Sequence, residues 1–266
     1  MAKYTLDTEF SLLNGPKAHN WILRFRSMAD AAFAGKDDRS RLLGNLLIME
    51  QYVNTLKKGL SADGKQISAV LQNALDLLWG YLDGCVAVTD LQDLANDIYA
   101  STLAYNADEE LTDAQMEFYQ EHFGDGELSS IEWQNITWAS WLLVEVVAIE
   151  GGRSDFEEAS AYEQISFAYI DVDLIPFLTG ASISIADVPL PSNTGADYSK
   201  AEEQVYQTSL FRCIIGHIQD GLRAALTATP EQYPSLRAKY QESTIIPSEY
   251  ITRLMDFQKM NRDLRR

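Results

Sequence analysis

Apolar residues recur every three or four positions along most of the chain, which is the spacing of an amphipathic α-helix. One helix is predicted between Pro16 and Gly35, and a second from Asp37 or Asp38 to Gly59. Further helices are expected at about 66–82, 85–104, 130–150, 197–227 and 247–264. Thr112–Gln115 and Ser154–Glu157 have the pattern of capping boxes. The predicted fold class is all-α, a multi-helix, bundle-like domain.

The segment IPFLTGASISIADVPLPSNTG, residues 175–195, interrupts this pattern. It holds three prolines, two glycines and the short alternating run SISIAD. These features predict a long connection that includes at most one small strand. The expected organisation is an N-terminal helical body over 1–174, a connection over 175–196, and C-terminal helices over 197–266 packed on the same body.

Composition restricts the class of protein further. A chain of 266 residues with 46% hydrophobic residues can bury a sizeable core. Cys85 and Cys213 form no disulfide or zinc pattern, and the N-terminal residues do not resemble a signal peptide. Apolar runs such as WLLVEVVAI are too short to span a bilayer. A soluble cytoplasmic protein is expected.

Charge is distributed very unevenly along the sequence. Residues 61–199 hold 25 of the 39 Asp and Glu residues but only two bases, Lys65 and Arg153. The flanking parts carry slightly more bases than acids, and the net charge of the whole chain is −18. An acidic middle of this kind disfavours nucleic acid and anionic membranes and favours a basic partner, although it can also serve only to keep the protein soluble.

Within this acidic middle, Asp76, Asp83, Asp90 and Asp97 follow one another at intervals of seven, with Asp93 among them. At 100° per residue they fall opposite two successive apolar stripes, on the outside of two helices. The apolar pattern changes phase near Gly80 and Gly84. Those glycines mark a break between the helices or allow close helix packing, and we favour the break.

The outward placement leaves a solvated face and a partner-binding face as the main interpretations of these aspartates. A metal or catalytic site inside a helical bundle needs carboxylates that project inward, so it is the less favoured interpretation.

Other candidates for chemistry are few. Glu145 shares a helical face with Trp138 and Trp141, so it is either a carboxyl of raised pKa with acid–base function or a paired core residue. Cys213 and His217 lie one helical turn apart and suit a metal less well than a core position, because further ligands are not evident.

Two further histidines suggest no site. His122 ends a predicted helix, and His19 lies in a first helical turn. The chain contains no nucleotide-binding or hydrolase motif, and we predict no cofactor and no metal.

Residues Leu75–Leu94, with LDLLW followed by DGCVAVTDL, resemble a segment of an uncharacterised all-helical bacterial family. That family is similar to one group of helical immunity proteins from bacterial polymorphic-toxin systems. The resemblance covers about 20 residues and carries over no catalytic residue. It implies a cytosolic protein that neutralises a toxin, often a basic nuclease, by covering its active cleft.

Three hypotheses follow. The first is a non-enzymatic immunity protein that binds a cognate, basic toxin through Asp83, Asp90, Asp93 and Asp97. The second is a helical hydrolase with carboxylate chemistry around Glu145. The third is an acidic adaptor or structural protein. The sequence gives no oligomeric state.

Overall fold

The computed structural model describes residues 4–9, 20–59, 65–105, 112–123, 175–189 and 195–256. The regular structure in these ranges is helical, without a strand, which confirms the predicted all-α class. The chain divides into two compact units. Unit 1 comprises Met1–Gly59 and Ser166–Arg266, and unit 2 comprises Leu60–Ile165. This grouping differs from the boundaries near 175 and 197 that the sequence suggests.

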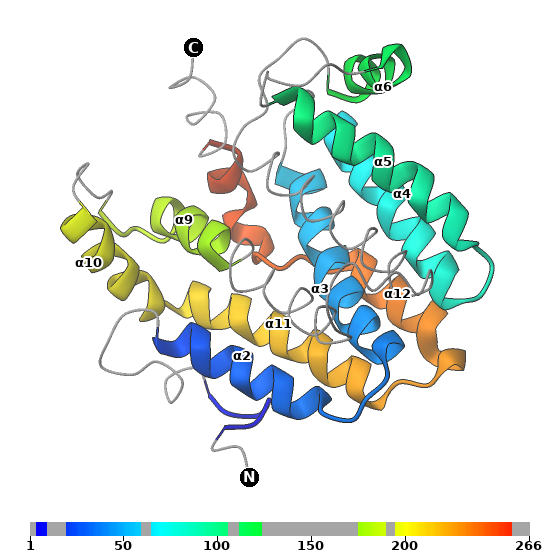
Figure 1. Ribbon diagram of the computed structural model, residues 1–266. Coiled ribbons are helices and arrows are strands. Elements are labelled where there is room, and N and C mark those ends of the chain that lie inside the picture. Colours follow the sequence, from blue (N-terminus) through cyan, green and yellow to red (C-terminus); the bar gives the residue numbers. More distant parts are fainter. Residues whose placement is uncertain are drawn as a thin grey trace. The chain divides into compact units, whose positions relative to one another are not determined.

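Unit 1 brings together helices from both ends of the chain (Figure 1). Its α-helices are α2 (Asn20–Phe33), α3 (Asp38–Gly59), α9 (Ile175–Ile185), α10 (Gly195–Tyr206), α11 (Ser209–Thr227) and α12 (Tyr233–Glu242). The short 3-10 helices η3 (Pro230–Gln232) and η4 (Ser248–Tyr250) follow α11 and α12, and residues 251–256 are helical. Helix α11 contacts α2, α3, α9 and α10, and α3 also contacts α12.

Helices α3 and α11 share the most extensive contact in the described part of unit 1. Every residue from 41 to 53 of α3 is buried. A Cβ atom added to Gly44 would lie 3.3 Å from a methyl of Leu222, and one added to Gly221 would lie 3.2 Å from Ile48. Since both helices present a glycine to a larger side chain of the other, their backbones approach closely and the apolar side chains interlock.

Local signals set the ends of the first two helices where the sequence predicts them. Gly35, just after α2, adopts a positive φ of 75°, which glycine tolerates best. Asp37 precedes α3, and its Oδ1 accepts hydrogen bonds from the Ser40 hydroxyl at 2.6 Å and from the Ser40 backbone N–H at 2.9 Å. These bonds lower the pKa of Asp37, the hydroxyl bond having the larger effect.

The prediction of a connection over 175–195 is wrong for its first half, because Ile175–Ile185 form helix α9. The alternating run does not make a strand, since Ser182, Ile183 and Ile185 are buried within this helix. Thr179 donates its hydroxyl proton to the Ile175 carbonyl at 2.8 Å, so a polar side chain is satisfied inside the helix. Hydroxyl residues therefore resemble a polar loop in the sequence but are compatible with a buried helix.

The predicted helix over 197–227 is also incorrect in detail, because it is two helices, α10 and α11. Thr208 interrupts it with an extended backbone, φ −73° and ψ 152°, and its hydroxyl accepts a hydrogen bond from the Phe211 N–H. Helix α12 was not predicted, and it buries only Tyr233 and Tyr240 of its ten residues. Of the expected helix over 247–264, residues 251–256 are helical, and those after 256 lie outside the described residues.

Unit 2 contains three described helices, α4 (Lys65–Leu82), α5 (Val88–Tyr105) and α6 (Asp113–Phe123), and each contacts the other two. Their bounds agree with the predicted helices at 66–82 and 85–104 and with a cap near Thr112. Most of the described apolar residues of α4 and α5 are buried, whereas Val88 is half-buried. The buried residues of α4 and α5 are Val70, Leu71, Ala74, Leu75, Leu78, Trp79, Leu82, Leu91, Leu94 and Ala95. The predicted helix over 130–150 and the capping box at Ser154–Glu157 lie outside the described residues.

Candidate functional site

The turn between α4 and α5 fixes the direction in which the acidic residues point. The N–H of Cys85 donates to the Gly80 carbonyl at 2.8 Å, and the N–H of Gly84 donates to the Tyr81 carbonyl at 3.1 Å. Gly84 has a φ of 73°. This pair of bonds with a left-handed glycine is the Schellman arrangement, which ends a helix sharply. The predicted break at Gly84 is therefore confirmed.

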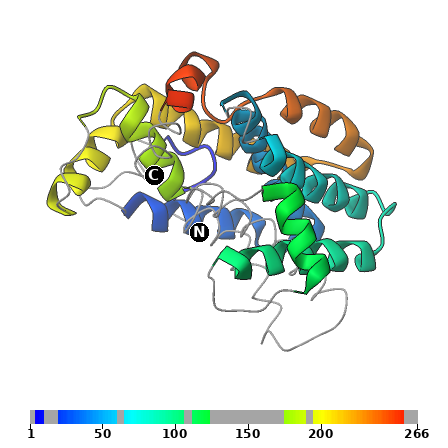
Figure 2. The same ribbon diagram turned by 90° about the horizontal axis from the view of Figure 1, so that it is seen from above.

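Gly80 has a different role in the same turn. A Cβ atom at this position would lie 2.3 Å from a methyl of Val86, so the glycine allows Val86 to pack directly against α4. This contact and the Gly84 conformation together bring α5 back along α4, and the two helices lie next to each other (Figures 1 and 2).

The aspartates lie where the helical phase predicts them. Asp83, Asp90 and Asp93 are exposed, and Asp97 is half-buried. Asp90, Asp93 and Asp97 are three and four residues apart on α5 and thus share one side of that helix. Asp76 on α4 is also exposed and accepts a hydrogen bond from the Gln72 amide at 3.0 Å.

Asp90 has a contact that caps its own helix. Its carboxylate accepts a hydrogen bond at 3.3 Å from the backbone N–H of Ala87, just before α5 begins. It also lies in the first turn, where a negative charge interacts favourably with the helix dipole. Part of its presence is thus explained by the helix itself, whereas Asp83 and Asp93 are exposed and cap no helix among the described residues.

The electrostatic character of this part of the chain is strongly one-sided. Residues 65–105 contain five aspartates and a single base, Lys65, at the far end of α4. Like charges three or four residues apart destabilise a helix by about 0.2–0.5 kcal/mol per pair. The acidic side of α5 is therefore slightly unfavourable for folding, and we define Asp83, Asp90, Asp93 and Asp97 as the acidic face.

This arrangement does not offer a metal site. Among the residues that the structure describes, no three His, Cys, Asp or Glu side chains converge as metal ligands would. Outward carboxylates on successive helical turns are also spread along the surface instead of around a point. The acidic face can attract and orient a cationic surface.

Cys213 and His217 do meet on α11, as their spacing predicts. The imidazole Nδ1 lies 3.1 Å from the Ile245 carbonyl, which can only accept, so Nδ1 carries the proton and Nε2 faces the Cys213 sulfur at 3.7 Å. Burial and, to a smaller extent, the charge of Glu249 raise the pKa of Cys213. A half-buried thiol whose pKa is raised fits a packing contact better than an activated nucleophile.

The remaining sequence candidates receive no structural description. Glu145 and its two tryptophans lie outside the described residues, as does His19. His122 lies in the last turn of α6, and its side chain is not described.

Two clusters in unit 1 were missed by sequence reasoning. Glu50 of α3 has a side chain only 2% exposed, and its carboxylate lies 3.2 Å from Nε of Arg237 on α12. The Gln241 amide also donates to it, at 3.4 Å. The second cluster surrounds Arg223 of α11, whose partners are Asp7, Asp220 and the Leu6 carbonyl.

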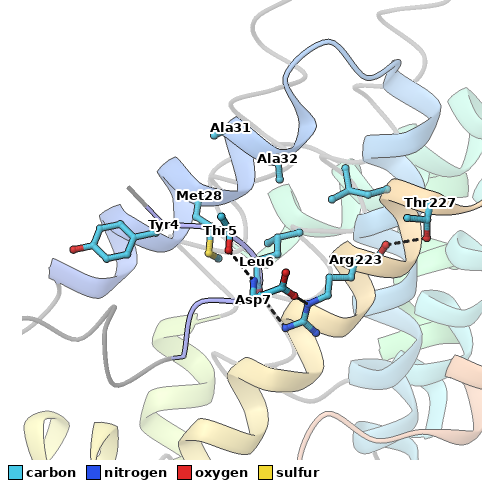
Figure 3. Close-up of a pocket in the computed structure, with 10 residues that line it drawn as sticks. Tyr4, Thr5, Leu6, Asp7, Met28, Ala31, Ala32, Arg223 and Thr227 are labelled. Carbon is cyan, nitrogen blue, oxygen red and sulfur yellow. Dashed lines mark hydrogen bonds and ion pairs between the residues drawn. The ribbon is translucent and has the colours of Figure 1, made fainter. Parts of the chain in front are cut away.

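Arg223 borders a cavity of about 410 Å³ between residues 4–7, α2 and α11 (Figure 3). Its walls are mostly apolar, with Leu6, Met28, Ala31, Ala32 and Leu226 among the lining residues. Two of the partners of Arg223, Leu6 and Asp7, lie more than 200 positions before it in the sequence, and no local pattern predicts these contacts. The chain thus presents an acidic face on unit 2 and a cavity with an arginine on unit 1.

The described helices contain no stretch that combines the length and the apolar character required to cross a membrane. Comparison with known proteins gives no relative: no protein-family model, no curated protein and no solved structure matches this chain.

Proposed function

We propose that this chain is a cytoplasmic immunity protein that binds a cognate, basic toxin through the acidic face of unit 2. One observation carries the binding part: Asp83, Asp90, Asp93 and Asp97 all lie off the buried stripes of α4 and α5, with Lys65 as the only base in residues 65–105. The toxin as partner rests on the resemblance of residues 75–94 to helical immunity proteins.

Electrostatics supports a protein partner of opposite charge. A surface of one sign accelerates the encounter with an oppositely charged partner and selects against partners of the same sign. The same surface repels the phosphates of nucleic acids and anionic lipids. Since Asp83 and Asp93 are exposed and lie off the buried stripes, a role in binding explains their presence better than a role in folding does.

The proposal assigns the chain no catalytic step and no cofactor. Inhibition by an acidic protein requires only that it cover the basic cleft of the toxin, where its carboxylates take the place of substrate phosphates. We expect a stoichiometric complex whose affinity falls as salt concentration rises.

The test is co-expression and co-purification with the product of the adjacent gene, followed by charge reversal on the acidic face. The first variant changes Asp83, Asp90, Asp93 and Asp97 to Lys. The matched control changes four exposed acids of unit 1 to Lys, namely Glu203, Glu242, Glu249 and Asp256. Both variants change the net charge equally, so a difference between them reports position. Circular dichroism and thermal unfolding confirm that each is folded.

At low salt we expect the unit 2 variant to associate at least about tenfold more slowly than the unit 1 variant. Because Asp90 also accepts the Ala87 N–H, Asp90→Asn, which keeps an acceptor oxygen, separates its charge from its cap. If both quadruple variants bind the partner equally well, the acidic face is not the binding interface. If the neighbouring gene product is harmless and does not bind, the proposal that the partner is a toxin is contradicted.

A further inference from the structure

Residues 5–8 form a compact turn. The N–H of Thr8 donates to the Thr5 carbonyl at 2.8 Å, and the N–H of Thr5 donates to the Thr8 hydroxyl oxygen, also at 2.8 Å. These two reciprocal bonds close a four-residue turn with Leu6 and Asp7 at its tip. The segment therefore has a defined shape that comes from its own residues, before any contact with the helices is considered.

This turn is held on α2 and α11 by several unlike contacts. Arg223 Nη2 donates to the Leu6 carbonyl at 2.8 Å, and its Nε lies 2.9 Å from the Asp7 carboxylate (Figure 3). One helical turn earlier, the Gln219 amide donates to the Thr8 carbonyl at 3.1 Å. Leu6 itself is only 5% exposed. Arg223 and Gln219 are four residues apart and therefore lie on one side of α11. Together they bind two backbone carbonyls and one carboxylate.

The contacts resemble those by which proteins recognise short peptides. An apolar side chain serves as the anchor, main-chain carbonyls are bound by side-chain donors, and a guanidinium recognises a carboxylate. Arg24 on α2 adds a cationic contact to the ring of Tyr4, 5.7 Å from its centre. We call this surface of α2 and α11 the turn-binding groove.

The segment does not fill the groove. The cavity of about 410 Å³ remains between the turn and the helices, lined by Met28, Ala31, Ala32 and Leu226. Well-packed interiors leave few voids larger than a water molecule. The Asp7 side chain is 83% exposed, so water and salt weaken its ion pair with Arg223. A short segment that is held by one buried side chain and an exposed ion pair can be displaced by a similar turn from another protein.

We propose that the turn-binding groove is a docking site for a turn on a partner protein that presents an apolar residue followed by an aspartate, and that residues 4–9 occupy it as an internal competitor. The observed fit of Thr5-Leu6-Asp7-Thr8 shows which chemistry the groove accepts. The groove selects its partner with Arg223 and an apolar cavity, whereas the acidic face selects a cationic surface. This site is therefore independent of the proposed toxin binding.

The experiment uses the full chain and a fluorescently labelled peptide with the sequence YTLDTE, capped at both ends. A variant that weakens the internal turn, Leu6→Ser with Asp7→Asn, is compared with the unaltered chain. A third variant adds Arg223→Gln to these two changes. The control peptide YTSNTE lacks the apolar anchor and the carboxylate. Fluorescence anisotropy gives the affinities, and circular dichroism with thermal unfolding verifies that each protein is folded.

We expect the peptide to bind the weakened-turn variant about tenfold more tightly than the unaltered chain, because a tethered segment competes at a local concentration on the order of millimolar. The Arg223→Gln change and the control peptide should each abolish this binding. If the double variant does not fold, Asp7→Asn alone should give a smaller gain in peptide affinity.

Two results would overturn the proposal. One is a folded weakened-turn variant that binds YTLDTE no better than YTSNTE, and the other is equal binding by this variant and the unaltered chain. Light scattering gives a third criterion. If the unaltered chain is a dimer and the dimer is lost when the turn is weakened, the docked protein is a second copy of this chain and not a different partner.

Discussion

The two units use charged residues in opposite ways. The described residues of unit 1 contain 13 Lys and Arg and 15 Asp and Glu, and several of them join distant parts of the chain. Glu50 pairs with Arg237, Asp187 with Arg253, and Asp7 with Arg223. The described residues of unit 2 contain eight acids and one base, Lys65. Charge in unit 1 connects elements, whereas charge in unit 2 forms a surface of one sign.

This difference bears on why the chain is acidic. A general need for solubility would favour acids on every part of the surface. Instead, unit 1 is close to neutral, and the excess is concentrated in the sequence that folds as unit 2. A local excess of charge is more easily explained by a local role, such as binding, than by a property of the whole molecule.

The sharpest test of this contrast is to remove one acid from each unit. Glu50→Ala should lower the free energy of unfolding by about 2–4 kcal/mol, because it leaves Arg237 without its carboxylate at a site that is largely shielded from water. Asp93→Ala, at an exposed position of α5, should change it by no more than about 0.5 kcal/mol.

Hydrogen–deuterium exchange, resolved by peptide, measures both effects in the unit that carries the change. Protection should fall in α3 and α12 for the Glu50 variant and remain unchanged in α4 and α5 for the Asp93 variant. Glu50→Gln keeps an acceptor oxygen and should recover part of the loss. If Asp93→Ala were as damaging as Glu50→Ala, the proposed division between connecting and surface charges would be wrong.

The next test compares two glycines with the same backbone conformation. Gly35 after α2 and Gly84 after α4 have φ angles of 75° and 73°, and an added Cβ would meet nothing within 4 Å at either site. Valine at each should destabilise its unit by about 1–2 kcal/mol, through conformation alone. Asparagine, which tolerates a positive φ better, should cost less.

Only the Gly84 variants should also alter partner binding, because Gly84 sets how α5 leaves the turn and hence where Asp90 and Asp93 lie. The Gly35 variants provide the matched control for general destabilisation. Denaturant unfolding and the association rate of the partner are measured on the same proteins. Equal losses of binding for both glycines would indicate that binding follows overall stability and not the geometry of the acidic face.

How far the sequence predicts this molecule depends on the range of the interaction. Local sequence predicts the helix ends at Gly35, Asp37 and Gly84, and helical phase predicts that the aspartates point outward. The structure confirms the helix ends and the exposure of Asp76, Asp83, Asp90 and Asp93, whereas Asp97 is half-buried. Helix α9 was missed because its proline, its glycine and the alternating run SISIAD resemble a loop, although Thr179 is satisfied by a carbonyl one turn earlier. Polarity in a sequence does not reveal whether a hydroxyl bonds to its own helix.

The contacts between residues far apart in the sequence could not be predicted for a different reason. Glu50 and Arg237 are 187 residues apart, and Arg223 and Leu6 are 217 apart. Nothing in the local pattern around Glu50 distinguishes it from a solvated acid, and only the packing of α12 on α3 makes it a buried partner. The exposed aspartates of unit 2 could be predicted from helical phase within two neighbouring helices, whereas the turn-binding groove required the fold.

The smallest expected effect is a difference in stability between substitutions of two aspartates. Each of them accepts a backbone hydrogen bond at the start of a helix. Asp37 accepts from the N–H and the hydroxyl of Ser40, and Asp90 accepts from the Ala87 N–H at a longer 3.3 Å. Asp37→Ala should therefore lower stability by about 1 kcal/mol, and Asp90→Ala by a few tenths.

Because the pKa of Asp37 is lowered from 3.8 in the folded protein, its carboxylate stabilises the fold above that pH, and the benefit is lost as the pH falls through the depressed folded pKa. The stability difference between the unaltered chain and Asp37→Ala should consequently be constant near neutral pH and shrink below about pH 4. Urea unfolding between pH 3 and 7 measures it. If the stability difference is undiminished at the lowest pH, the charge of the Asp37 carboxylate is not what caps α3. The contrast between Asp37, which stabilises its helix, and Asp90, whose charge serves the surface, would then lose this support.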